Sequence, residues 1–186
     1  MTSPVREAHW VLAAQSGDRE ALGKLLTALE EPLSRYVLHV VRRAELADDI
    51  LQEVFLRICK SLEFLREPEL FRAWAYRIAT REAVRALKKE RAWSERVDPE
   101  VAPEDTAASD PERLDPDVLQ RLLAMLEALS PSSRAVIHLH YFDEMSIYEV
   151  AEVLDVPPGT VKSRLAYGLA ALRRTIASPS KVGGNE

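Results

Sequence analysis

Apolar residues recur three and four positions apart along most of the chain, and this spacing predicts amphipathic helices. The clearest example runs from about Leu46 to Leu62, where Leu51, Val54, Phe55 and Ile58 form one stripe. No segment shows the sustained alternation of apolar and polar residues that is typical of a half-buried strand. The pattern therefore predicts an all-α protein.

Turn-forming residues divide this pattern into separate helices. Gly17 and Asp18 are expected to end one short helix and to cap the next. Pro32 predicts a further helix start, because proline favours the first helical position. In the second half, the sequence SPSS predicts a turn and an N-cap, and residues 134–142 open the helix that follows.

Charge is distributed unevenly along the chain. The formal net charge is −5, yet residues 92–117 alone carry nine acidic and two basic side chains together with four of the 11 prolines. Such a composition buries too little apolar surface to offset the entropy of ordering. It predicts a flexible acidic linker at 92–117 that joins two small helical bundles, 1–91 and 118–176, with a short tail at 177–186. The second bundle opens with an apolar stripe of Val118, Leu122, Met125, Leu126 and Leu129.

A helix-turn-helix is predicted in the second bundle. The segment MSIYEVAEVLDV places Ile147, Val150, Ala151 and Leu154 on one helical face, and a short turn leads to a second helix. That helix, residues 157–174, carries four basic residues and no acidic one. It has the charge needed to enter a major groove, although a solvated basic face on an ordinary helix is the alternative. The candidate DNA-binding residues are Thr160, Lys162, Ser163, Arg164 and Tyr167.

A second basic helix is predicted at residues 71–91. Phe71, Trp74 and Tyr76 interleave with basic residues at its beginning, a composition typical of surfaces that hold single strands by stacking and phosphate contact. Packing is the competing interpretation, and it leads us to expect Trp74 in the core. The residues at core spacing with Trp74 are Phe71, Ile78, Val84 and Leu87.

An acidic stripe follows the outward face of the helix around residue 50. Its members are Glu45, Asp48, Asp49, Gln52 and Glu53. Acid–base catalysis or metal binding is the weaker interpretation, because the four histidines form no ligand cluster at metal spacing. We therefore expect no metal, cofactor or enzymatic activity. Docking on a basic protein partner is a stronger interpretation than catalysis or metal binding. A plain solvated face is about as well supported as docking.

The single cysteine and the absence of long apolar runs exclude further classes. Cys59 has no partner for a disulfide or a CxxC motif, and its neighbours Phe55, Ile58 and Leu62 predict a core position. Neither a signal peptide nor an apolar stretch of membrane-spanning length is visible. The sequence predicts a cytosolic protein without membrane insertion.

Three ordered blocks carry a family resemblance over nearly the whole chain. They are AELADDILQEVFLRI, FRAWAYRIATREAVRALKK and LSPSSRAVIHLHYFDEMSIYEVAEVLDVPPGTVKSRL. Together they resemble the successive signatures of the extracytoplasmic-function group of sigma-70 bacterial sigma factors. The resemblance implies a promoter-specificity subunit of RNA polymerase with two helical domains and an extended linker.

The resemblance also implies a role for each candidate residue. Asp48, Asp49, Gln52 and Glu53 would dock on the clamp helices of the largest polymerase subunit, and the flap of the polymerase would be a further contact. The basic helix and the loop before it, residues 64–70, would melt the minus-ten element and hold a flipped base. The minus-ten candidates are Phe64, Arg66, Arg72, Trp74, Arg77, Arg81, Arg85, Lys88 and Lys89. The helix-turn-helix candidates would face the minus-thirty-five duplex, and an anti-sigma factor is an expected partner.

Some residues depart from the family pattern. Arg81 and Arg85 stand where the family often has Asn and Asp, which puts the usual base contacts in doubt. Pro157 removes a common side-chain N-cap, for which Pro158 partly compensates as a first helical residue. Asp155 replaces a frequent turn glycine and must adopt a left-handed conformation. Tyr167 replaces a commonly basic residue or histidine and favours a methyl or phosphate contact.

Two other classes of protein stay open. A stand-alone helix-turn-helix regulator would use the C-terminal bundle by itself and would bind duplex DNA tightly without polymerase. An enzyme acting on nucleic acid would require metal-dependent turnover at the acidic stripe. Neither class explains why the acidic stripe, the aromatic-basic helix and the helix-turn-helix occur together in this order.

Overall fold

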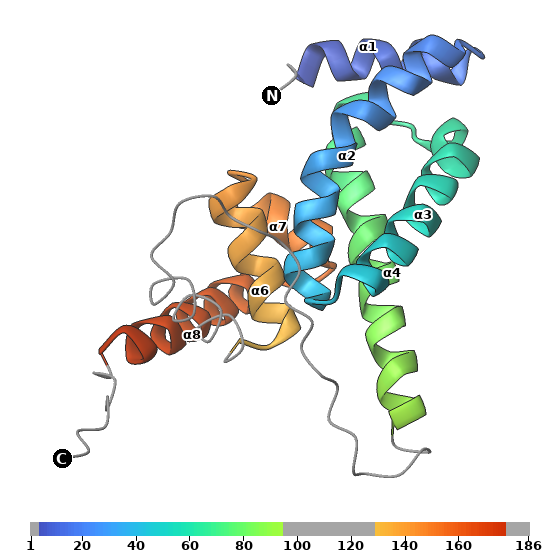
Figure 1. Ribbon diagram of the computed structural model, residues 1–186. Coiled ribbons are helices and arrows are strands. Elements are labelled where there is room, and N and C mark those ends of the chain that lie inside the picture. The colour runs from blue at the N-terminus through green and yellow to red at the C-terminus, as the bar shows by residue number, and fades with distance from the viewer. Residues whose placement is uncertain (1–3, 95–128, 178–186) are drawn as a thin grey trace, which may run out of the picture.

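The computed structural model describes residues 4–94 and 129–177, and in these ranges the chain forms helices and no strand. Figure 1 shows the helices in two groups, α1 to α4 and α6 to α8. Of the predicted stripe at residues 118–129, Leu129 is described and is buried. The rest of that stripe, the predicted tail beyond residue 177 and the predicted linker beyond Ser94 lie outside the described residues. The helices are α1 (Pro4–Gln15), α2 (Arg19–Val41), α3 (Ala44–Ser61), α4 (Phe71–Ser94), α6 (Pro131–Ile137), α7 (Ile147–Leu154) and α8 (Pro158–Ala177). Three short turns of helix connect them: η1 (Leu62–Phe64), η2 (Pro68–Leu70) and η3 (His138–Phe142).

The junction of α1 and α2 forms as the sequence predicts. Gly17 has φ +96°, a conformation that glycine adopts without strain. The carboxylate of Asp18 then accepts hydrogen bonds from the amides of Glu20, at 2.9 Å, and Ala21, at 3.1 Å. This cap satisfies two of the amides that a helix start leaves without an intrahelical partner.

The predicted helix start at Pro32 is wrong, because Pro32 lies inside the continuous helix α2. An interior proline costs about 3 kcal/mol in helix stability. Leu29 and Leu33, on either side of it, are fully buried in one stripe that continues to Tyr36. Burial of such side chains contributes about 1.5–3 kcal/mol each, which is enough to keep the helix intact through the proline.

The first module, α1 to α4, packs around α2 (Figure 1). The stripe that α3 buries consists of Ala47, Ile50, Val54 and Ile58, and the stripe of α4 consists of Phe71, Ala75, Tyr76, Ala79 and Ala83. The expectation that Cys59 is a core residue is wrong, because Cys59 is exposed on the face next to Ile58. Val84 was also expected in the core and is 41% exposed, because Ala83 takes the inward position one residue earlier.

The second module, α6 to α8, lies directly on the first (Figure 1). Helix α6 packs on α2, and α7 packs on α4. Val136, Leu139, Val150 and Val161 are buried in the same continuous apolar cluster as the core of the first module. The two bundles that the sequence predicts are therefore in direct contact and share one core.

The helix-turn-helix is formed by α7 and α8. Ser146 and Glu149 make a reciprocal capping box at the start of α7. Asp155 ends α7 with φ 54° and ψ 49°, the left-handed conformation that the sequence requires of it. Helix α8 begins at Pro158, whose fixed φ suits the first helical position.

Candidate nucleic-acid interface

The acidic stripe faces solvent on α3. Its five members, Glu45, Asp48, Asp49, Gln52 and Glu53, are exposed, as their spacing predicts. The opposite face of the helix holds Ala47, Ile50 and Val54 in the core. The charges of the stripe are therefore separate from the packing that folds the helix.

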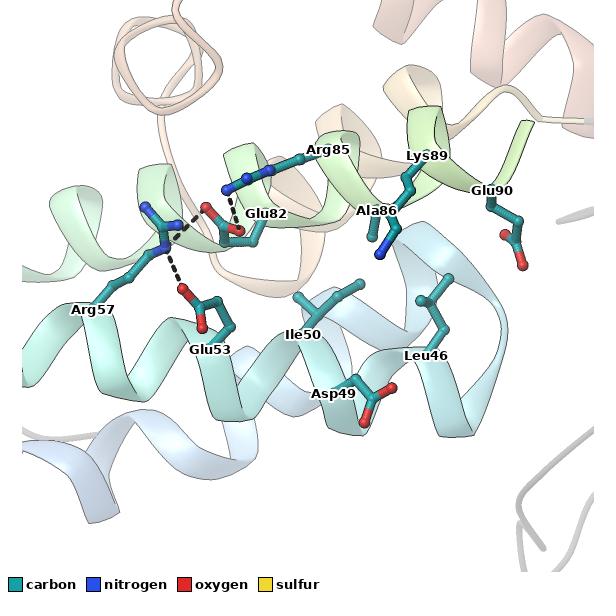
Figure 2. A pocket seen from close by; sticks show the side chains of 10 residues that line it. All are labelled: Leu46, Asp49, Ile50, Glu53, Arg57, Glu82, Arg85, Ala86, Lys89 and Glu90. Carbon is teal, nitrogen blue, oxygen red and sulfur yellow. Dashed lines mark hydrogen bonds and ion pairs between the residues drawn. The ribbon is translucent and has the colours of Figure 1, made fainter. Parts of the chain in front are cut away.

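A groove of about 800 Å³ runs between α3 and α4 (Figure 2). Leu46, Ile50 and Ala86 supply apolar surface to it. The charged residues of the groove are Asp49, Glu53 and Arg57 from α3 and Glu82, Arg85, Lys89 and Glu90 from α4. Asp49 and Glu53 of the acidic stripe thus border one side of a partly apolar groove, and residues of both charges from α4 border the other.

Arg57 neutralises part of the acidic stripe. Its Nε lies 2.8 Å from a carboxylate oxygen of Glu53 and 3.1 Å from one of Glu82 (Figure 2). Among the described residues, Asp48 and Asp49 form no comparable ion pair. The sequence reading missed Arg57, although its position four residues after Glu53 is the spacing of a helical ion pair.

The basic residues of α4 fall into two groups. Arg81, Arg85, Lys88 and Lys89 are exposed and free to meet a polyanion, although Arg81 and Arg85 are near acidic side chains. Arg72 is half-buried and donates to the buried carboxylate of Glu7 at 2.6 Å. Burial alone would lower the pKa of Arg72, but the hydrogen bond and charge of Glu7 raise it above its ordinary value. Arg72 therefore ties α4 to α1, and its side chain is already engaged.

A small pocket of about 270 Å³ lies between the loop at 64–70 and α4. Its lining residues are Phe64, Leu65, Arg66, Glu67, Leu70, Ala73, Trp74, Arg77 and Glu152. Phe64 is 73% exposed at its edge. The Nε of Arg77 is buried and has no hydrogen-bond partner in the described part of the chain. Trp74 is half-buried, so it packs against the core and also lines the pocket.

Gln15, at the end of α1, holds the loop that forms this pocket. Its side-chain amide donates to the carbonyl oxygens of Leu62 and Leu65, at 2.8 Å each. The carbonyl of Leu62 also accepts from the backbone N–H of Leu65 at 3.1 Å, so the side chain of Gln15 adds a second donor there and fixes the end of η1 to α1. The sequence reading missed Gln15 because no local pattern links it to a loop some 50 positions away.

The outer face of α8 carries the helix-turn-helix candidates. Lys162 and Ser163 are exposed, Tyr167 is 60% exposed, and Thr160 and Arg164 are half-buried. The hydroxyl of Ser163 donates to the carbonyl of Thr160 at 3.0 Å, so a DNA contact would compete with this local bond. Val161 is fully buried, which fixes the rotation of the helix and turns Lys162 outward.

No described helix is long and apolar enough to cross a bilayer. Within residues 4–94 and 129–177, no group of three or more potential ligands is arranged to hold a metal ion.

Two cationic helices, one beside an aromatic-edged pocket and one in a helix-turn-helix, define a helical nucleic-acid-binding protein. Residues 25–93 match the family description "Sigma-70 region 2", and residues 119–172 match "Sigma-70, region 4". The chain belongs to the extracytoplasmic-function group of sigma-70 RNA polymerase sigma factors, which confirms the resemblance. It serves in promoter recognition and transcription initiation.

Similar proteins cover almost the whole chain. The chain is 33% identical to the ECF RNA polymerase sigma factor SigL of Mycobacterium tuberculosis, over 89% of this chain and 96% of that protein. It is 28% identical to the ECF RNA polymerase sigma factor SigW of Bacillus subtilis, over 87% of this chain and 92% of that protein. The fold is similar to that of the sigma factor RpoE, in its complex with the anti-sigma factor NepR from Bartonella quintana, with a TM-score of 0.74, 20% identity, and coverage of 85% and 98%.

Proposed function

We propose that the acidic stripe, the pocket and α8 make three separate contacts during initiation, in line with the roles that the family resemblance implies. The observation that carries this proposal is that each surface presents exposed side chains of the expected chemistry. These are Asp48 and Asp49 on the stripe, Phe64 and Arg66 at the pocket, and Lys162 and Ser163 on α8. The domain bounds 1–91, 92–117 and 118–176 are part of the same proposal.

The acidic stripe docks on the clamp helices of the largest polymerase subunit. Asp48 and Asp49 supply the charge, Gln52 adds an amide, and the groove beside them offers apolar surface. Glu53 contributes less charge, because Arg57 already neutralises it. The second module makes a further contact with the polymerase flap.

The pocket and the basic face of α4 hold the melted minus-ten strand. Phe64 and Trp74 provide aromatic surface for a flipped base, and Arg77 brings an unpartnered N–H to the same pocket. Arg66 from the loop, together with Arg81, Arg85, Lys88 and Lys89 along α4, provides cationic contacts for phosphates. Arg72 acts through its ion pair with Glu7, which orients the start of α4.

Helix α8 reads the minus-thirty-five duplex through Thr160, Lys162, Ser163, Arg164 and Tyr167. The site of action is the cytoplasm, where polymerase and promoter DNA are found, and no catalytic step is assigned to the chain. An anti-sigma factor is proposed as a regulatory partner, because the similar sigma factor RpoE is found in complex with one.

Run-off transcription with bacterial core polymerase tests the proposal. The wild-type chain is expected to direct transcripts from specific start sites on fragmented genomic DNA, and the variant Asp48→Lys/Asp49→Lys is expected to direct none. The matched control Glu30→Lys/Glu144→Lys changes the net charge equally at exposed positions outside the stripe. Equal transcription by both variants would refute the docking role, and the absence of specific transcripts with the wild type would refute the function itself.

A further inference from the structure

Gly168 is buried on the inner face of α8, where that helix packs on α6 (Figure 1). A Cβ atom placed on Gly168 would lie 2.8 Å from Cδ1 of Ile137 and 3.5 Å from Cβ of Ser133, both on α6. The first distance is well below the contact separation of two carbon atoms, which is about 3.5–4.0 Å. The two helices therefore approach each other at a point where, as they stand, only a residue without a side chain fits.

The other glycines of the described residues have no such neighbour. At Gly17, Gly23 and Gly159 an added Cβ would meet nothing within 4 Å. Glycine in the interior of a helix lowers the stability of that helix relative to alanine. At Gly168 the close approach of α6 supplies a reason for glycine that is absent at the other three positions.

The part of α6 that faces Gly168 is held in place by hydrogen bonds within the second module. The hydroxyl of Ser130 accepts from the amide of Ser133 at 3.2 Å and donates to the hydroxyl of Ser133 at 3.1 Å. The guanidinium of Arg134 donates to the carbonyl of Leu129 at 2.8 Å. These bonds fix the first turn of α6, so a side chain at position 168 would displace α8 and not α6.

Ile137 also transmits such a displacement to α8. It is 8% exposed and packs in a small apolar cluster with Leu129 of its own module segment and with Leu165, Ala171 and Leu172 of α8. A turn of its Cδ1 methyl away from position 168 would change the packing of these α8 side chains. The contact between Gly168 and Ile137 therefore controls how α8 lies on α6.

Val161 is the second fixed point of the inner face of α8. It is fully buried in the main core and lies two turns, about 10 Å along the axis, before Gly168. Arg164 lies between these two positions, about one turn from each. The inclination of α8 between Val161 and Gly168 therefore sets how far Arg164 projects from the module.

We propose that Gly168 is a positioning residue for promoter recognition, because its contact with Ile137 sets the depth at which Arg164 meets the minus-thirty-five base pairs. This inference rests on the proposed function of α8. Hydrogen bonds to base edges form over a range of only about 0.5 Å, and a bidentate guanidinium contact also requires a fixed direction. An ammonium group meets a phosphate as a point charge, so the contacts of Lys162 tolerate a tilt of the helix far better.

The substitution Gly168→Ala tests the proposal by adding the Cβ that meets Ile137. Holoenzymes are compared on a library randomised across the upstream promoter element. The variant is expected to lose about fivefold or more of its discrimination at one or two base pairs, the size of effect of one bidentate contact. Its binding to unrelated duplex DNA is expected to stay unchanged. Gly23→Ala is the matched control, because it makes the same change in α2, where a Cβ has open space, and it should keep every base preference.

A second substitution on α6 is expected to restore the preference. Ile137→Val removes Cδ1 and keeps the position of Cγ1, which lies 3.6 Å from the added Cβ, an ordinary contact. The double variant Gly168→Ala/Ile137→Val should therefore show the base preference of the wild type. A general loss of stability would not be repaired in this way, because shortening a buried isoleucine by itself destabilises a core.

Three results would overturn the proposal. They are an unchanged base preference in Gly168→Ala, a failure of Ile137→Val to restore a changed one, and loss of the folded state of Gly168→Ala in a thermal melt, which would make Gly168 a residue needed for folding. A wild-type holoenzyme without any base preference in the upstream element would refute the proposed reading by α8, and this inference with it. Failure of the proposed function and failure of this inference alone therefore give different results.

Discussion

The Nδ1 atoms of His39 and His138 lie 2.6 Å apart across the boundary between the two modules. At this distance one ring donates a hydrogen bond and the other accepts it, so the facing nitrogens share a single proton. Burial, reinforced by the nearby charges of His138 and Arg35, lowers the pKa of His39 from 6.5 to about 4. Asp143 acts in the opposite direction, and Arg42 adds to the lowering.

The first prediction concerns pH. Between pH 6.5 and about 4, the unfolded chain binds a proton at His39 that the folded chain does not bind, so folding stability falls as the pH falls through this window. After discounting for partial exposure to solvent, we expect a loss of roughly 1–2 kcal/mol from this group. Urea unfolding followed by circular dichroism over this pH range measures it.

His39→Gln is expected to remove most of this pH dependence, because no proton is then taken up at that position on unfolding. His9→Gln is the control, since His9 is exposed and lies outside the module boundary. If the free energy of unfolding changes with pH by the same amount in both variants, the contact between His39 and His138 is not the source of the pH dependence.

The second prediction distinguishes members of the acidic stripe. Asp49→Asn is expected to weaken binding to core polymerase about tenfold, the size of effect found when a charge contact in an interface is lost. Glu53→Gln is expected to have a smaller effect, because Arg57 already pairs with Glu53 at 2.8 Å. Fluorescence anisotropy of the labelled chain with core enzyme measures both affinities, and a larger loss with Glu53→Gln would contradict this ranking.

Helix faces could be predicted from the sequence with good accuracy, whereas contacts between distant residues could not. The stripe of Asp48, Asp49 and Glu53 faces outward because the apolar spacing of α3 fixes its rotation. Val84 and Cys59 were predicted to be buried, and in each case the buried residue lies one position earlier, at Ala83 and Ile58. Small residues on α4 and the nearby end of α3 make the apolar stripe harder to locate there. At Pro32 local propensity predicted a boundary, and burial of the flanking leucines overrode it.

The role of Arg72 shows the limit of reasoning from composition. Its place among seven basic residues on one helix predicts contact with DNA, which stays a prediction, and gives no sign of the pair that the structure shows with Glu7 from another helix. The packing of α7 on α4 and the hydrogen bond from Tyr76 to Asp143, 67 positions away, were equally invisible. Such partners are fixed by tertiary packing and leave no periodic signal in the sequence.

The third prediction concerns the loop of the pocket. Gln15→Leu keeps the size of the side chain and removes its two hydrogen bonds to Leu62 and Leu65, which are expected to contribute about 1 kcal/mol each. Promoter melting by the holoenzyme should fall several-fold, while the affinity for core polymerase stays unchanged. A fluorescent base analogue in the minus-ten element reports the melting. Ser16→Ala is the control, because the hydrogen bonds of Ser16 within the described residues stay in its own helix end. Equal melting by both variants would remove Gln15 from the site.

The last prediction separates base reading from backbone contact along α8. Arg164 lies near the beginning of the helix, where a guanidinium can make a bidentate contact to guanine in the major groove. Arg173 is exposed nine residues later, about 13 Å further along the helix axis, where only phosphate contact is expected. Arg164→Ala should therefore cost roughly 1–3 kcal/mol on the cognate promoter and relax the preference at one or two base pairs.

Arg173→Ala should weaken binding to all sequences alike and reduce the salt dependence of binding. Both variants are compared as holoenzymes on a library randomised across the upstream promoter element. Since Arg164 is half-buried, its position also depends on the packing of α8, and a melting curve of each variant checks that the helix is intact. If Arg164→Ala keeps every base preference and is only uniformly weaker, α8 contacts the phosphate backbone and does not read the bases.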